Sequence, residues 1–230
     1  QCYGKELKWL KERKQHMSTK IETLLFDLDG TLINTTDLII ASFTDTLDRY
    51  FPNKFSREDI VQFIGPPLRE TFMKIDAQKA DELIQQYREH NLKHHDALVK
   101  EYKGVYETIA ALKEDDYKIG VVTTKLRPTV NRGLQVGRLD SFFDVVVTLD
   151  DVKNAKPDPE PIYKALDQLK SDPSSSIMVG DSHHDILAGK NAGTYTAGVS
   201  WSVKGEDYLQ SYKPDYMLGN MSDLLRIIKG

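Results

Sequence analysis

The chain has 230 residues, enough for one large domain or for a core domain that carries an insert. With 40% hydrophobic and 29% charged residues it has an ordinary globular composition, and a formal net charge of −4 disfavours nucleic acid or an anionic membrane as the main partner. No apolar run approaches the roughly 20 residues of a membrane span, and no signal peptide is recognisable. Because Cys2 is the only cysteine, no internal disulfide can form, and we expect a cytoplasmic protein.

Residues 1–16 are short, basic and loosely amphipathic, unlike the sequence after Met17. We interpret this segment as an N-terminal extension or a cloning remnant that is not part of the fold. A helix on a membrane surface is the alternative interpretation.

The first predicted strand is Thr23–Phe26, a short apolar run that stops at Asp27. An apolar run without alternation is typical of a parallel strand that is buried on both faces. Similar runs predict further strands at 119–122, 145–147, 177–179 and 195–199. Helical patterns lie between several of them, as at 105–114 and 162–169. This alternation predicts an α/β fold with a doubly wound, Rossmann-like parallel sheet.

One block departs from this alternation. Between residues 35 and 100 we find helical patterns and no convincing strand. The predicted helices cover 38–50, 57–64, 68–75 and 77–92. We therefore predict an all-helical cap at 35–100, inserted into an α/β core that is formed by 17–34 and 101–230.

An acidic motif, Asp27-Leu28-Asp29-Gly30, directly follows the first strand. In an extended segment Asp27 and Asp29 point to a common face, where their carboxylates repel unless a cation or a shared proton intervenes. Taken alone, the motif is equally consistent with an ordinary turn rich in Asp and Gly.

Two further motifs supply groups suited to an anion. Thr123 and Thr124 follow the second strong strand, where hydroxyl and backbone N–H groups suit phosphate oxygens, although threonine is also common in strands for packing reasons. Lys156 precedes three alternating prolines that stiffen its loop and could aim its charge, and a solvated lysine is the alternative. Nearby Lys125 and Arg127 are interpreted as solvated charges.

The last motif follows the fourth strand and contains Asp181 and Asp185. Carboxylates after a strand and a glycine fit a site for a hard cation such as Mg²⁺, with Asp185 in a supporting role. His183 and His184 invite a transition-metal interpretation, but histidines beside carboxylates are at least as often hydrogen-bonding or surface residues.

All four motifs follow strands, and open α/β sheets place ligands at that edge. In this order they resemble the motifs of the haloacid dehalogenase superfamily of phosphohydrolases, over about residues 24–199. The resemblance implies that Asp27 attacks phosphorus and becomes a phosphoaspartate. It implies that Asp29 protonates the leaving group and then activates water, and the presence of Asp29 disfavours dehalogenation.

The resemblance also implies the ligands of a Mg²⁺ cofactor and of the phosphoryl group. The metal ligands would be two side chains and a backbone carbonyl, those of Asp27, Asp181 and Asp29. The phosphate-binding residues would be Thr123, Thr124 and Lys156. The family often has Asn or Gly at position 124, so only the backbone N–H of Thr124 is expected to contribute.

Within the superfamily, four segments are similar to the cytoplasmic inorganic pyrophosphatases that are related to phosphoglycolate phosphatases: 63–72, 94–96, 147–152 and 180–187. This similarity implies hydrolysis of pyrophosphate to two phosphates, and a functional link to dephosphorylation of a sugar-transport phosphocarrier protein. Arg69, after Pro66-Pro67, is the candidate ligand of the second phosphate, and a helix-surface arginine is the alternative.

Three other functions remain as alternatives. A phosphomonoesterase for phosphoglycolate or another small metabolite would use the same core with a different cap selectivity. A phosphomutase is less favoured because its phosphoenzyme must be protected from water. A non-catalytic binding module is disfavoured because the acidic residues and the lysine are all intact.

Overall fold

The computed structural model describes residues 20–229, and the predicted extension at residues 1–16 lies outside the described residues. At the centre is a six-stranded sheet in which every neighbouring pair of strands is parallel. From edge to edge the strands are β5 (Val145–Val147), β4 (Lys118–Val122), β1 (Thr23–Phe26), β6 (Ser176–Gly180), β7 (Tyr195–Val199) and β8 (Tyr216–Leu218). The predicted parallel sheet is confirmed, and β8 is a strand that the sequence pattern does not predict.

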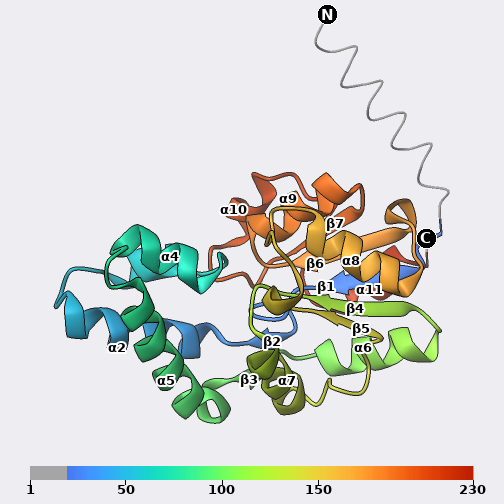
Figure 1. Ribbon diagram of the computed structural model, residues 1–230. Coiled ribbons are helices and arrows are strands. Elements are labelled where there is room, and N and C mark those ends of the chain that lie inside the picture. The colour runs from blue at the N-terminus through green and yellow to red at the C-terminus, as the bar shows by residue number, and fades with distance from the viewer. Residues whose placement is uncertain (1–19, 230) are drawn as a thin grey trace, which may run out of the picture.

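Helices cover both faces of this sheet (Figure 1). One face carries α6 (Val105–Glu114), α7 (Arg127–Val136) and α11 (Asp223–Ile227). The other face carries α8 (Glu160–Leu169) and α9 (His183–Ala192). The short α10 (Glu206–Gln210) contacts β7, and two short 3₁₀ turns, η1 (Leu149–Asp151) and η2 (Pro173–Ser175), lie in loops. The sheet is therefore doubly wound, as predicted.

The central strand β1 shows why its sequence lacks alternation. All four of its residues are fully buried. Leu24 and Phe26 belong to the apolar cluster beneath α6 and α7, whereas Leu25 belongs to the cluster beneath α8 and α9. Both faces of the strand need apolar side chains, because each buried leucine or phenylalanine contributes about 1.5–3 kcal/mol.

A helical block lies to one side of the sheet (Figure 1). It consists of α2 (Thr36–Tyr50), α3 (Arg57–Gln62), α4 (Leu68–Ile75) and α5 (Ala80–Leu98). The block has its own apolar cluster, in which Phe43 packs against Phe72 and Tyr87 at ring-centroid distances of 5.4 and 4.8 Å. The helices predicted in this region are present, and α5 runs to Leu98, beyond the predicted end.

The chain enters and leaves the helical block through two paired strands of two residues each. β2 (Ile33–Asn34) and β3 (Lys100–Glu101) are antiparallel, with Ile33 opposite Glu101 and Asn34 opposite Lys100. This pair, here called the β2–β3 ribbon, lies between the sheet and the block (Figure 1). Among residues 20–229, no helix is both long and apolar enough to span a membrane.

Candidate active site

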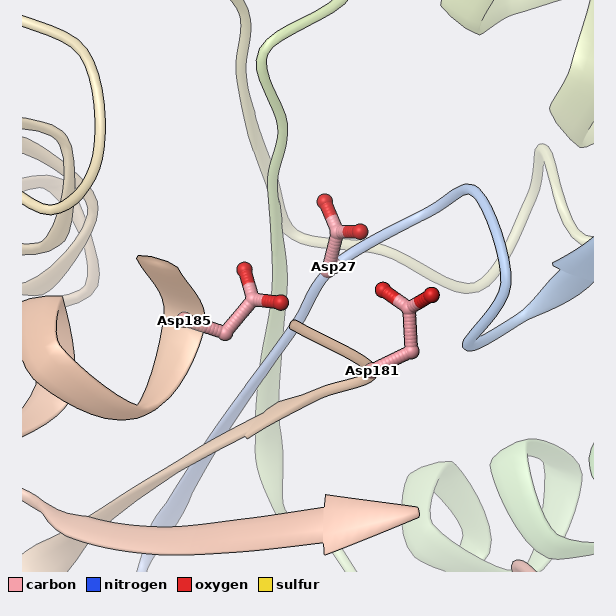
Figure 2. A group of neighbouring side chains, drawn as sticks. All are labelled: Asp27, Asp181 and Asp185. Carbon is pink, nitrogen blue, oxygen red and sulfur yellow. The ribbon is translucent and has the colours of Figure 1, made fainter. Parts of the chain in front are cut away.

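Three carboxylates meet at the carboxyl end of the sheet. Asp27 follows β1 directly, Asp181 follows the neighbouring strand β6, and Asp185 lies in the first turn of α9. Their carboxylate groups lie beside one another (Figure 2), and one oxygen of each lies within 4.8 Å of the others. All three residues are buried.

Burial and mutual repulsion shift the ionisation of this acidic group. Burial raises the pKa of Asp27, Lys156 opposes that shift, and the charges of Asp185 and Asp29 reinforce it. Burial likewise raises the pKa of Asp181 well above its ordinary value, together with the charges of Asp27 and Asp185. A cation bound among these oxygens would relieve both effects. Because all the donors are carboxylate oxygens, they fit a hard cation such as Mg²⁺.

Lys156 neutralises part of the acidic group from within the protein. Its Nζ donates to Asp27 Oδ1 at 2.9 Å, to Asp185 Oδ1 at 2.6 Å and to the carbonyl oxygen of Val122 at 2.7 Å. Burial opposes the charged form, but Asp185 and Asp27 outweigh burial and raise the pKa of Lys156. The residue is only 3% exposed, so the alternative of a solvated lysine is wrong.

The loop that carries Lys156 is held in place by the start of α8. Glu160 accepts hydrogen bonds from the backbone N–H groups of Lys153 and Asn154, each at 2.9 Å. Together with the alternating prolines, these bonds fix the loop that delivers the ammonium group.

Asp185 has both of its oxygens engaged within the protein. Oδ1 accepts from Lys156, and Oδ2 accepts from the backbone N–H and the hydroxyl of Ser182 at 3.0 and 2.7 Å. The bond from the backbone N–H of Ser182 is half of a capping box at the N-terminus of α9. This geometry supports a role for Asp185 in holding Lys156 rather than in binding a metal directly.

The turn after β1 brings Asp29 to the same edge of the sheet. Gly30 has φ +78°, and a Cβ there would lie 2.2 Å from Asp181 Oδ2, so both its conformation and its surroundings require glycine. Lys125 Nζ lies 3.8 Å from Asp29 Oδ2. Burial opposes the charge of Lys125, but Asp29 raises its pKa above the ordinary value. Interpreting Lys125 as solvated is wrong, because its side chain is only 24% exposed.

The two threonines after β4 differ in their contacts. Thr123 is buried, and its Oγ1 accepts the backbone N–H of Lys125 at 3.3 Å. Thr124 Oγ1 donates instead to the carbonyl oxygen of Gly65, in the loop between α3 and α4, at 3.2 Å. The hydroxyl of Thr124 therefore connects the sheet domain to the helical block.

A cavity of about 350 Å³ lies between the sheet edge and the helical block. Its floor includes Asp27, Asp29 and Asp181, and its roof includes Phe43 and Tyr87. The cationic residues that line it are Lys125, Lys156, Arg69, Arg88 and Arg132. The cavity therefore combines an acidic centre with cationic side chains set in a largely apolar wall, an arrangement that suits a metal-bound anion.

The predicted ligand Arg69 lies at the wall of this cavity, but its guanidinium pairs with Asp81 and is largely exposed. Arg132, on α7, makes two bonds to Asp96 of α5, at 2.8 and 2.9 Å. Hydrogen bonds from Arg132 and His95 hold the pKa of Asp96 at about 2. Arg127 donates to the carbonyl oxygen of Val146 and pairs with Asp151, and its side chain is 41% exposed, so it is a partly solvated charge held in an ion pair.

The comparisons with known proteins agree with this geometry. The family of haloacid dehalogenase-like hydrolases matches residues 24–199, from β1 to the end of β7. The chain belongs to this family. Curated pyrophosphatases PpaX from Anoxybacillus flavithermus and Bacillus cereus are 61% and 60% identical to it over 208 and 209 residues, which cover 90% and 91% of this chain and 97% of each relative.

A solved structure described as a predicted phosphoglycolate phosphatase, from Haemophilus somnus, is 26% identical to this haloacid dehalogenase-like hydrolase, with a TM-score of 0.78. The match covers 90% of this chain and 97% of that one. The fold predicted from the sequence is therefore also the fold of a solved relative.

His184 also lines the cavity of this haloacid dehalogenase-like hydrolase. The sequence patterns assign this residue no role at the site. Burial lowers its pKa to about 4, so its ring is neutral near pH 7. His183 beside it accepts or donates a 2.6 Å hydrogen bond between Nδ1 and the Tyr208 hydroxyl. Among residues 20–229, the metal-ligand type residues that gather in a group of three or more are Asp27, Asp181 and Asp185, without either histidine.

Proposed function

We propose that this chain hydrolyses inorganic pyrophosphate to two phosphates, with Mg²⁺ as cofactor. The observation that carries the proposal is the identity of about three residues in five, over nearly the full length, to proteins named pyrophosphatases. The cavity suits this class of substrate. Its cationic side chains can bind a small phosphate anion, and the carboxylates on its floor can bind the metal ion that such an anion needs.

In the proposed reaction, a carboxylate oxygen of Asp27 attacks one phosphorus, and the bond from that phosphorus to the bridging oxygen breaks. Asp29 gives a proton to the departing phosphate. Asp29 then takes a proton from a water molecule, whose oxygen attacks the phosphorus of the phosphoaspartate and releases the second phosphate and free Asp27. The position of both carboxylates on the cavity floor supports this division of roles.

The protein's own groups would prepare each step. Lys156 would pass from Asp27 to a phosphoryl oxygen when the substrate binds, because its contact with Asp27 is one that a phosphoryl anion can replace. Thr123 and the backbone N–H of Thr124 would orient the same phosphoryl group. Mg²⁺, held by Asp27, Asp181 and the backbone carbonyl of Asp29, would neutralise the charge on the transferring group.

We further propose that residues 35–100 act as a cap over a core formed by 17–34 and 101–230. Three observations support this division: the helical block has its own apolar cluster, the β2–β3 ribbon joins it to the sheet, and both parts line the cavity. A cap that closes would exclude water from the phosphoaspartate until the product leaves.

The main alternative is a phosphomonoesterase for phosphoglycolate or a related small metabolite, and the Haemophilus somnus neighbour favours it. A phosphomutase and a non-catalytic binding module remain less favoured. The link to a phosphocarrier protein stays a prediction from the resemblance.

The test is phosphate release from pyrophosphate, phosphoglycolate and a panel of sugar phosphates, each with Mg²⁺ and with chelator. We expect pyrophosphate to lead in kcat/KM by about two orders of magnitude, or roughly 2.7 kcal/mol of transition-state preference. A lead for phosphoglycolate or a sugar phosphate would replace the substrate and keep the mechanism. No Mg²⁺-dependent release from any substrate would leave only a binding role.

A further inference from the structure

The imidazole of His184 is an unusual element of the cavity wall. Its Nδ1 is buried and has no hydrogen-bond partner. Buried polar atoms are nearly always paired in folded proteins, so an unpaired one at a functional cavity requires an explanation. The other ring nitrogen, Nε2, also has no partner but is not enclosed, and the residue lines the same cavity as Asp27.

The surroundings of Nδ1 determine which nitrogen carries the proton. Gly65 of the helical block approaches this atom closely, since a Cβ added there would lie 3.3 Å from His184 Nδ1. Among residues 20–229 no group pairs with Nδ1, so an N–H group at this position would be left unsatisfied. Buried N–H groups without partners are rarer than under-satisfied acceptors, so Nδ1 is the unprotonated nitrogen and Nε2 carries the hydrogen. His184, which lines the cavity, therefore has a neutral N–H donor at Nε2.

We propose that the Nε2–H group of His184 donates a hydrogen bond to the phosphate that leaves, and that His184 thereby helps to select diphosphates over phosphate monoesters. The inference rests on the proposed pyrophosphatase activity. Lys156 and a cation bound by the carboxylates would neutralise the phosphoryl group at Asp27. The second phosphate would then bind to residues of the cavity wall and roof. A neutral donor suits that position, because it binds a phosphate oxygen and still allows the product to leave.

The neighbouring His183 provides a matched control. Its Nδ1 is engaged with the Tyr208 hydroxyl, and its ring stacks on Tyr212 at a centroid distance of 5.1 Å. It does not line the cavity. The two adjacent histidines thus differ in the feature that the proposal uses, because only His184 lines the cavity.

The test compares three substitutions of His184 with His183→Gln. Glutamine places an amide N–H near the position of Nε2, whereas asparagine reaches only the position of Nδ1, and phenylalanine keeps the ring without a donor. We expect His184→Phe and His184→Asn to lower kcat/KM for pyrophosphate about 10- to 100-fold. Activity on a phosphate monoester such as p-nitrophenyl phosphate should stay within about threefold, and His184→Gln and His183→Gln should retain most pyrophosphatase activity.

A second readout does not depend on turnover. In protein labelled with ¹⁵N-histidine, the His184 resonances should report a neutral Nε2–H tautomer, and methylenediphosphonate with Mg²⁺ should shift them more than phosphate does. Equal losses on pyrophosphate and on the monoester, or unchanged pyrophosphatase activity in folded His184→Phe, would overturn the proposal. Wild-type protein that splits the monoester but not pyrophosphate would instead overturn the proposed function, while the ¹⁵N shift would still decide whether His184 meets a diphosphate.

Discussion

Lys156 is the side chain around which the acidic centre is organised. Its three contacts, to two carboxylates and a carbonyl, use all the donors of an ammonium group. The interaction therefore serves both stability and chemistry, because the same charge that allows Asp27 and Asp185 to be buried together would later meet the phosphoryl group. Breaking a buried pair by removing one partner leaves an uncompensated charge, which is costly.

We therefore predict that Lys156→Met abolishes phosphatase activity and destabilises the protein by about 3–5 kcal/mol, since two buried carboxylates lose their counter-ion. Urea unfolding measures the second effect. Lys74→Met, at an exposed position of α4, should change stability by no more than about 0.5 kcal/mol. If the two variants unfolded at the same urea concentration, the role given to Lys156 in the acidic centre would be wrong.

Asp27→Asn should have opposite effects on activity and stability. Loss of the nucleophile should lower kcat by about 10⁴-fold or more. Loss of a negative charge from a crowded, buried group should raise the melting temperature of the metal-free protein, which calorimetry in chelator would measure. Asp140→Asn, at an exposed position, is the matched control and should change neither quantity. Full activity in Asp27→Asn would exclude the phosphoaspartate.

At the scale of elements, the turn between β1 and β2 depends on glycine for two separable reasons. Gly30 and Gly104 have similar positive φ values, +78° and +82°, but only Gly30 has a neighbour that a Cβ would strike, the carboxylate of Asp181. Alanine should therefore strain the backbone at both Gly30 and Gly104. Only alanine at position 30 should also displace Asp181, a candidate metal ligand.

We predict that Gly30→Ala and Gly104→Ala each lose about 1 kcal/mol or more from strain, and that only Gly30→Ala also needs much more Mg²⁺ for half-maximal activity. Titrating activity with Mg²⁺ at constant substrate checks this difference. An unchanged Mg²⁺ requirement in Gly30→Ala would argue against Asp181 as a metal ligand.

Several elements follow from sequence patterns alone, and others do not. The buried strands β1, β4, β5 and β6 are apolar on both faces, so their sequences are distinctive. Helix α9 has no strong apolar stripe, since it packs with small residues such as Ala188 and Gly189. The two-residue ribbon strands are too short for any periodicity.

Some residues of the candidate site could likewise be predicted from the sequence, and others could not. The sequence alone predicts that Asp27, Lys156 and Asp181 lie close together, because each follows a strand and the carboxyl ends of parallel strands share one edge. The partner of Arg69 could not be foreseen, because its pairing with Asp81 depends on how α4 packs on α5. The same limit applies to His184, whose importance depends on the approach of Gly65 from a segment more than 100 residues earlier.

At the scale of the whole molecule, the acidic centre should make stability depend on pH and on metal. The folded-state pKa values of Asp27 and Asp181 are raised above the unfolded value of about 4. A carboxyl group with a raised pKa favours folding fully only below its unfolded pKa, and the contribution is lost as pH rises through the folded pKa. Metal-free protein should therefore lose stability from about pH 4 towards neutral pH.

Mg²⁺ should counter this loss, because it binds the ionised carboxylates and not the unfolded chain. The gain in melting temperature between chelator and saturating Mg²⁺ should grow from pH 5 to pH 8. In a double variant with Asp27→Asn and Asp181→Asn, that gain should be small at every pH. A gain in the wild type that does not change with pH would show that Asp27 and Asp181 are not Mg²⁺ ligands.

The β2–β3 ribbon has a consequence for how the helical block can move. Ile33 lies opposite Glu101, and Asn34 lies opposite Lys100. Strand β2 therefore cannot slide along β3 without breaking the backbone hydrogen bonds between them. Bending of the ribbon as one unit remains, so we expect a swing about one axis rather than independent sliding. A single angle would then set both the width of the cavity mouth and the distance from Gly65 to His184. One pair of spin labels, on α5 and α8, would suffice to follow the opening.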